Sequence, residues 1–144
     1  MQRLISLGLG VLATTAVLLL ESNCSLANPV APAADNPATA TDTFTGTFGQ
    51  LGSVNHAFVV SAEGSITTRL TSVAPLSTMA IGVAIGSWDG TNCLNANTKN
   101  DGAKISTTAL SGIITPGNYC VRVYDSGNLP AAATATYSIE VVHP

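Results

Sequence analysis

An antiparallel β-sandwich with seven or eight strands and one disulfide is the fold that three observations predict. From Asp42 onward, short segments rich in Thr, Val and Ile alternate apolar with polar residues and are separated by Gly, Pro, Asn and Asp. No window after residue 27 has the helical period that parallel strands need for their crossovers. Two cysteines, Cys93 and Cys120, lie in this part of the chain, as is typical of exported β domains.

Residues 1–27 have the features of a secretory signal peptide. Arg3 precedes an uncharged apolar stretch, and Ala27 follows Ser and Leu at a small-residue cleavage site. We therefore expect a secreted or periplasmic protein that has no membrane attachment after cleavage. A retained anchor and a lipid on Cys24 are weaker alternatives, because the apolar run is short and Glu21 occupies a position where lipoprotein signals have Leu.

Residues 28–41 are rich in Pro, Ala and Thr, and they cannot bury enough apolar surface to offset the entropy of ordering. We expect a flexible linker there and a single β-sandwich domain over residues 42–144. The mild negative charge, −3 over the whole chain, lacks the basic stripe that nucleic acid would require, so nucleic acid is excluded as a partner.

Alternation predicts three strands in the first half of the domain, at 43–49, 55–61 and 65–72. The side chains expected on the apolar faces of the first and third strands are Phe44, Phe48, Ile66, Thr68 and Leu70. In the second strand His56, Phe58 and Val60 share one face, and Ala57 and Val59 share the other. Residues 79–85 alternate Ile and Val with Ala and Gly, so neither face is polar, and this pattern predicts a central strand that is covered on both sides.

The second half begins with a turn at Trp88-Asp89-Gly90 and a short strand around Cys93. Lys99–Gly102 is polar and predicts a loop. Further strands are predicted at 104–114, at 117–124 and over the alternating residues 135–141.

Cys93 and Cys120 are expected to form a structural disulfide. The disulfide would close a loop of about 27 residues between Cys93 and Cys120. Such a closure stabilises a small domain by roughly 3 to 4 kcal/mol in the chain-entropy model. A redox-active pair would have the close spacing of a C-x-x-C motif, which is absent.

Two segments resemble the bacterial pre-peptidase C-terminal domain. They are Trp88-Asp89-Gly90-Thr91-Asn92-Cys93 and the run from Thr115 to Asp125, which contains Gly-x-Tyr-x-Val-x-Val at 117–123. The resemblance extends over roughly residues 42–143. It implies a compact jelly-roll-like β-sandwich, usually appended to secreted peptidases and similar in fold to substrate-binding modules such as collagen-binding domains.

The sequence carries no recognisable catalytic motif, so we expect a protein that is not an enzyme. H-E-x-x-H, G-x-S-x-G and S-x-x-K are all absent. His56 and His143 are the only histidines, and His56, inside a predicted strand, is more simply a packed structural residue than a base paired with Asp42 or Glu63.

Calcium is the one metal that the composition suggests, with no other cofactor expected. Asp89, Asp101 and Asp125 are the best candidate ligands, because they lie near strand connections and supply oxygen atoms. Asp and Asn also favour turns for purely conformational reasons, which is the simpler interpretation of their positions.

Trp88 and Tyr124 are the candidate ligand-binding residues, since aromatic side chains near strand ends can stack on a sugar ring or anchor a protein contact. We expect a non-catalytic binding module for an extracellular polysaccharide or a protein surface, with the loops around these two residues as its contact region. The alternatives are a structural or assembly component of the cell envelope, and an accessory or inhibitor protein of a co-secreted peptidase.

Overall fold

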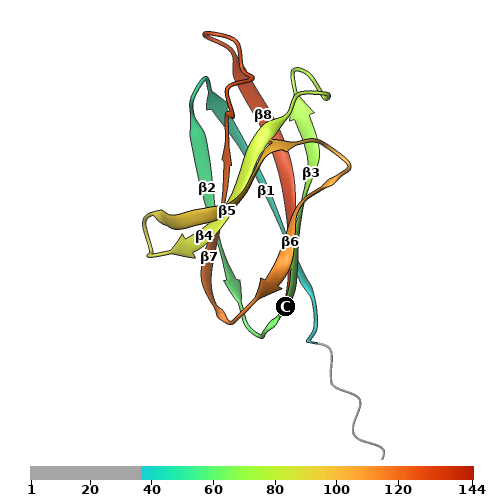
Figure 1. The fold of residues 1–144 in the computed structure, drawn as a ribbon, viewed down its shortest axis with the longest axis vertical. Coiled ribbons are helices and arrows are strands. Elements are labelled where there is room, and N and C mark those ends of the chain that lie inside the picture. Colours follow the sequence, from blue (N-terminus) through green and yellow to red (C-terminus); the bar gives the residue numbers. More distant parts are fainter. Residues whose placement is uncertain (1–36) are drawn as a thin grey trace, which may run out of the picture. The chain divides into compact units, whose positions relative to one another are not determined.

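The computed structural model describes residues 37–144, which form eight β-strands (Figure 1). The signal peptide and most of the linker predicted from the sequence lie outside the described residues. The strands are β1 (Ala40–Gly49), β2 (Ser53–Val60), β3 (Gly64–Ala74), β4 (Ile81–Trp88), β5 (Cys93–Ala103), β6 (Thr108–Ile114), β7 (Gly117–Tyr124) and β8 (Thr134–His143). No helix long and apolar enough to cross a membrane occurs in this part of the chain.

The strands form two antiparallel sheets of four, and the predicted β-sandwich is confirmed. One sheet has the order β1-β8-β3-β6 and the other the order β2-β7-β4-β5. Consecutive strands therefore lie in opposite sheets, except β4 and β5, which pair within one sheet, as in an eight-stranded jelly roll. Each sheet leaves two edge strands, and β5 and β6 are the edges that face each other on one side of the sandwich.

The core consists of the inward faces of both sheets. Leu70, Val83, Val121, Ile139 and Val141 are fully buried. The residues predicted to face inward from the first and third strands are buried or packed against this core, which confirms the phase of their alternation. In β2 the buried face is that of Phe58 and Val60. The strand predicted at 79–85 corresponds to β4, which has a neighbour on each side and is buried on both faces.

Most strand limits differ from the expected ones by one to three residues, and three segments differ in a way that has a clear physical reason. β1 begins at Ala40, inside the predicted linker, because Ala40 and Thr41 pair through their backbones with His143 and Val142. The loop predicted at 99–102 is wrong, since β5 runs through it as one strand. β5 is held in the sheet by backbone pairing with β4, and most of its side chains are exposed and polar. Its sequence therefore lacks the alternation of apolar and polar residues by which a strand is recognised.

The strand predicted from residue 104 begins only at Thr108. Residues 104–107 form a turn in which Ser106 has a φ of 62° and the hydroxyl of Thr107 donates to the carbonyl of Lys104 at 2.8 Å. Ile105 still packs against the core, which explains why the apolar pattern continued through the turn.

Candidate functional site

Both candidate aromatic residues belong to the sheet of β2, β7, β4 and β5. Tyr124 ends β7 and pairs with Gly82 near the start of β4, whereas Trp88 is the last residue of β4. At roughly 3.3 Å per residue, Gly82 and Trp88 are about 20 Å apart along the strand. The two candidate aromatics therefore lie toward opposite ends of β4 and do not adjoin each other, because the register between β7 and β4 places Tyr124 beside the start of β4.

Tyr124 is held on the outer face of this sheet by its neighbours. Its ring lies against the Cα of Gly82, where a Cβ would overlap the ring atoms. The phenol O–H donates a hydrogen bond to the Asp101 carboxylate, whose other oxygen is 3.0 Å from the ammonium of Lys99. The guanidinium of Arg122 lies 5.9 Å from the centroid of the Tyr124 ring, a distance typical of cation–π contacts.

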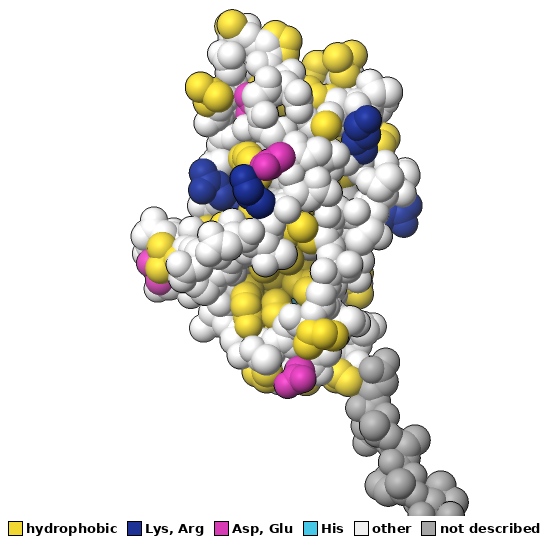
Figure 2. Space-filling view, viewed as in Figure 1, with side chains coloured by type: hydrophobic (Ala, Val, Ile, Leu, Met, Phe, Trp, Pro, Cys, Tyr) yellow, Lys and Arg dark blue, Asp and Glu magenta, His cyan; other side chains and the backbone are white. Residues whose placement is uncertain are grey.

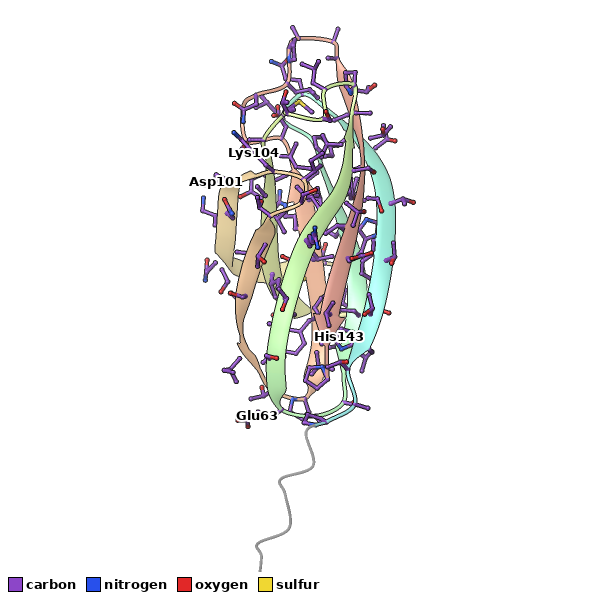
Figure 3. The ribbon with its side chains drawn as sticks, turned by 90° about the vertical axis from the view of Figure 1, so that its right-hand side faces the viewer. Glu63, Asp101, Lys104 and His143 are labelled. Carbon is purple, nitrogen blue, oxygen red and sulfur yellow. A yellow bond between two sulfur atoms is a disulfide. The ribbon has the colours of Figure 1, made fainter. Side chains whose placement is uncertain are left out.

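A shallow hollow of about 380 Å³ adjoins these side chains. Its lining residues are Ala84, Ala96, Asn97, Lys99, Arg122 and Tyr124. The floor is Ala84 on β4, which is almost fully buried. Figure 2 shows basic and acidic side chains gathered on this face, and Figure 3 shows Asp101 projecting outward from the sandwich. We call the six lining residues together with Asp101 the Tyr124 site.

The charges of the Tyr124 site are fixed at neutral pH. The hydrogen bond from Tyr124 lowers the pKa of Asp101, and Lys99 lowers it further. Burial, followed by the bond to Asp101, raises the pKa of Tyr124 to about 12. Asp101 is therefore ionised and the phenol protonated. Among the described residues, Lys99 forms an ion pair with Asp101 and Arg122 forms none, so the site has a surplus of positive charge.

Asp89 and Asp125, the other two candidate calcium ligands, each stabilise a turn. The carboxylate of Asp89 accepts the N–H groups of Thr91 at 2.8 Å and Asn92 at 2.6 Å, and these bonds lower its pKa. Asp125 accepts four backbone N–H groups, from Leu51, Gly127, Asn128 and Leu129. Burial raises the pKa of Asp125, but these four donors together outweigh it and hold the pKa below its usual value.

The structure does not bring the three aspartates together. Asp89 follows the end of β4 and Asp125 follows the end of β7, which pairs with the opposite end of β4. Asp101 is engaged by Tyr124 and Lys99. Within residues 37–144, no group of three or more His, Cys, Asp or Glu side chains is arranged to hold a metal ion.

The disulfide predicted between Cys93 and Cys120 is present, with a Cα–Cα distance of 5.6 Å. It joins β5 to β7 across the intervening strand β4. Disulfides form and persist in oxidising compartments, so the bond favours an extracellular type of environment.

The two histidines have structural contacts. His56 stacks on Phe44 with ring centroids 4.8 Å apart, and its Nε2 is 2.8 Å from the hydroxyl of Tyr137. Burial lowers the pKa of His56. The Nε2 of His143 is 3.1 Å from a carboxylate oxygen of Asp42, and the ring is almost fully buried near the end of the sandwich away from Asp101 (Figure 3).

Sequence reasoning identified Tyr124 and Asp101 but missed Arg122, Lys99 and Asn97 as members of one site. Arg122 could have been found, because residues two apart on a strand share a face and Arg122 precedes Tyr124 by two. Lys99 and Asp101 have the same spacing, but that segment was expected to be a loop. Lys99 and Asp101 lie near Tyr124 of β7 only because β5 pairs with β4, and β4 pairs with β7.

A comparison with protein-family models found no matching family, and a search of curated protein sequences found no match.

Proposed function

We propose that this chain is a secreted, non-catalytic binding module whose Tyr124 site takes an extracellular polysaccharide. The resemblance to the pre-peptidase C-terminal domain, which is similar in fold to substrate-binding modules such as collagen-binding domains, agrees with this proposal. The observation that carries it is the Tyr124 ring, held in place by Asp101 and Gly82 beside the guanidinium of Arg122, which has no ion pair among the described residues.

The chemistry of the Tyr124 site suits a sugar chain. The part of the Tyr124 ring that Gly82 and Arg122 leave exposed offers apolar contacts to the C–H groups of a sugar. Asn97 and Arg122 supply hydrogen-bond donors at the rim of the hollow, and the hollow is shallow enough to accept a segment of a continuous polymer. The surplus positive charge favours sugars that carry carboxylates, since Arg pairs with carboxylates in a bidentate geometry.

The test is depletion of the purified protein from solution by insoluble polymers. The panel contains acidic polysaccharide gels, peptidoglycan, chitin, cellulose and collagen, each with calcium or with chelator. We expect depletion by the acidic polysaccharides. Tyr124→Ala and Arg122→Gln should each reduce it, whereas Trp88→Ala, about 20 Å away along β4, should leave it unchanged.

Two results would contradict the proposal, and a third would change the contacts that it assigns. If none of the polysaccharides depletes the protein from solution, the proposed polysaccharide-binding function is ruled out. Loss of depletion in Trp88→Ala alone would place the contact region at the other end of β4. A requirement for calcium would show that the metal takes part, which the proposed contacts do not need.

A further inference from the structure

The strand β6 has a free edge with little protection against pairing. It is hydrogen-bonded to β3 on one side only. Its seven residues, Thr108–Ile114, include no charged residue and no proline. In an antiparallel edge strand, alternate residues direct both N–H and C=O groups away from the sheet, and such groups can pair with another extended chain.

An apolar cavity of about 550 Å³ adjoins this edge and extends between the two sheets. Its apolar lining comes from both sheets and consists of Ile66, Ile85, Leu110, Ile113, Ile114 and Tyr119. The polar side chains around it are Ser87, Asn95, Thr98, Ser111 and Thr115, so no charged residue lines it. Figure 2 shows a hollow with hydrophobic side chains at its base, beside the β5 and β6 edges.

The edge is closed at one end and open along the rest. The side-chain amide of Asn100 on β5 donates to the carbonyl of Ala109 on β6 at 2.9 Å. Beyond this bond, the segment from Leu110 to Ile114 borders the cavity. Ile113 is 74% exposed, so an apolar side chain is available on the outer face as well.

The facing edge strand, β5, is protected in ways that β6 is not. Its pairing with β4 is interrupted by two register shifts, and it carries the charged residues Lys99 and Asp101. Bulges and charges are the devices by which natural sheets prevent pairing at an edge. β2 has an uncharged sequence and an exposed Val59, but no residue of β2 lines the cavity.

We propose that the β6 edge binds an extended, uncharged segment of a partner protein as an added strand. Its main chain would pair with β6, and every second side chain, aliphatic in character, would enter the apolar cavity. Strand addition derives affinity from main-chain hydrogen bonds and specificity from pockets that accept alternate side chains. The uncharged lining of the cavity selects against a charged segment, because a buried unpaired charge is strongly unfavourable.

The probe is a short fluorescein-labelled peptide in which valine alternates with threonine. Its control is the same peptide with threonine at every valine position. We expect saturable binding of the first peptide by fluorescence anisotropy and weak binding of the second. Ile113→Lys should lower the affinity by about tenfold or more, because a lysine on an edge opposes strand pairing. Val59→Lys is the matched control, since Val59 is a similarly exposed aliphatic residue on another edge strand, and it should bind as the unchanged protein does.

A second measurement needs no change to the protein. The valine–threonine peptide is methylated on every second backbone nitrogen, in each of the two possible patterns. Only one of these patterns should abolish binding, because only every second N–H group of an added strand faces β6. The proposal would be overturned if the valine–threonine peptide does not bind saturably, or if Ile113→Lys and Val59→Lys lose equal affinity for it. It would also be overturned if methylation of the peptide has no effect on binding. Concentration-dependent dimers that Ile113→Lys dissociates would overturn the assigned occupant and identify it as a second copy of this chain.

Discussion

At the scale of single residues, Gly82 permits the position of the Tyr124 ring. The two residues pair directly across β4 and β7, and the ring occupies the space where any other residue would have its Cβ. The phenol can therefore reach Asp101 on β5. A site that joins three strands thus depends on the absence of one methyl group.

Gly82→Ala should displace the ring and break its hydrogen bond to Asp101. We expect polysaccharide binding to fall by about fivefold or more, the free-energy equivalent of about 1 kcal/mol. The pKa of Asp101, followed by NMR, should rise toward its ordinary value, because the bond from Tyr124 is the main cause of its depression. Gly112→Ala is the matched control, since a Cβ there meets nothing within 4 Å. An unchanged Asp101 pKa in Gly82→Ala would contradict this role of the glycine.

His56 is the residue that should make stability depend on pH near neutrality. Its pKa is lowered by burial in the folded protein, while in the unfolded chain it keeps its ordinary value near 6.5. The pKa of Tyr137 is raised to about 12 by burial, so its O–H remains available to donate to an unprotonated Nε2. The unfolded chain therefore binds the proton at a higher pH than the folded one.

The free energy of unfolding should consequently decrease as the pH falls through about 6.5, and this loss should level off below the depressed pKa of His56. His56→Gln removes the titration and keeps a partner for Tyr137. We expect the variant to lose less stability than the unchanged protein between about pH 7 and pH 5, measured by urea unfolding. Parallel pH profiles for the two proteins would show that His56 does not contribute.

At the scale of elements, β5 is attached to the molecule through β4, the disulfide and Asn100. It also carries Asn97 and Lys99 of the Tyr124 site. The geometry of the proposed binding site therefore depends on an edge strand that is covalently tied to β7.

Replacing Cys93 and Cys120 together by serine should lower the free energy of unfolding by about 3.5 kcal/mol, from the chain entropy of a closure with a sequence separation of 27. Polysaccharide binding should weaken as well, because β5 gains freedom relative to β7. Urea unfolding and the depletion assay check the two effects. Chemical reduction of the unchanged protein should reproduce both, and unchanged binding after reduction would show that β4 alone positions β5.

The strands were predictable from the sequence where one of their faces is buried. The alternation at Ile66 and Leu70, or at Val121 and Val123, reports burial on one side, and these strands were found in the right phase. β5 could not be recognised in this way, because its side chains are mostly exposed and show no alternation. Backbone pairing with β4 keeps it in the sheet. The turn before β6 was missed because Ile105 keeps an apolar contact with the core.

At the scale of the whole molecule, sequence patterns predicted the sandwich but not which strands are neighbours. Tyr124 and Asp101 were each recognised as chemically useful, yet for different ligands, and only the order β7-β4-β5 brings them into contact. Trp88 is the last residue of β4, at the opposite end of that strand from Gly82, with which Tyr124 pairs. The cavity beside β6 was beyond prediction for a similar reason, since its lining comes from five strands of both sheets and from Thr115 in the connection after β6.

The pairing of Ala40 with His143 has a mechanical consequence. The start of β1 and the end of β8 are adjacent and antiparallel, so a force that separates these two ends acts on one backbone pair at a time. The hydrogen bonds between β1 and β8 would break one after another, starting at this pair, and not all at the same time. A load applied between Ala40 and a ligand held at Tyr124 would follow a different path, because Tyr124 belongs to the other sheet.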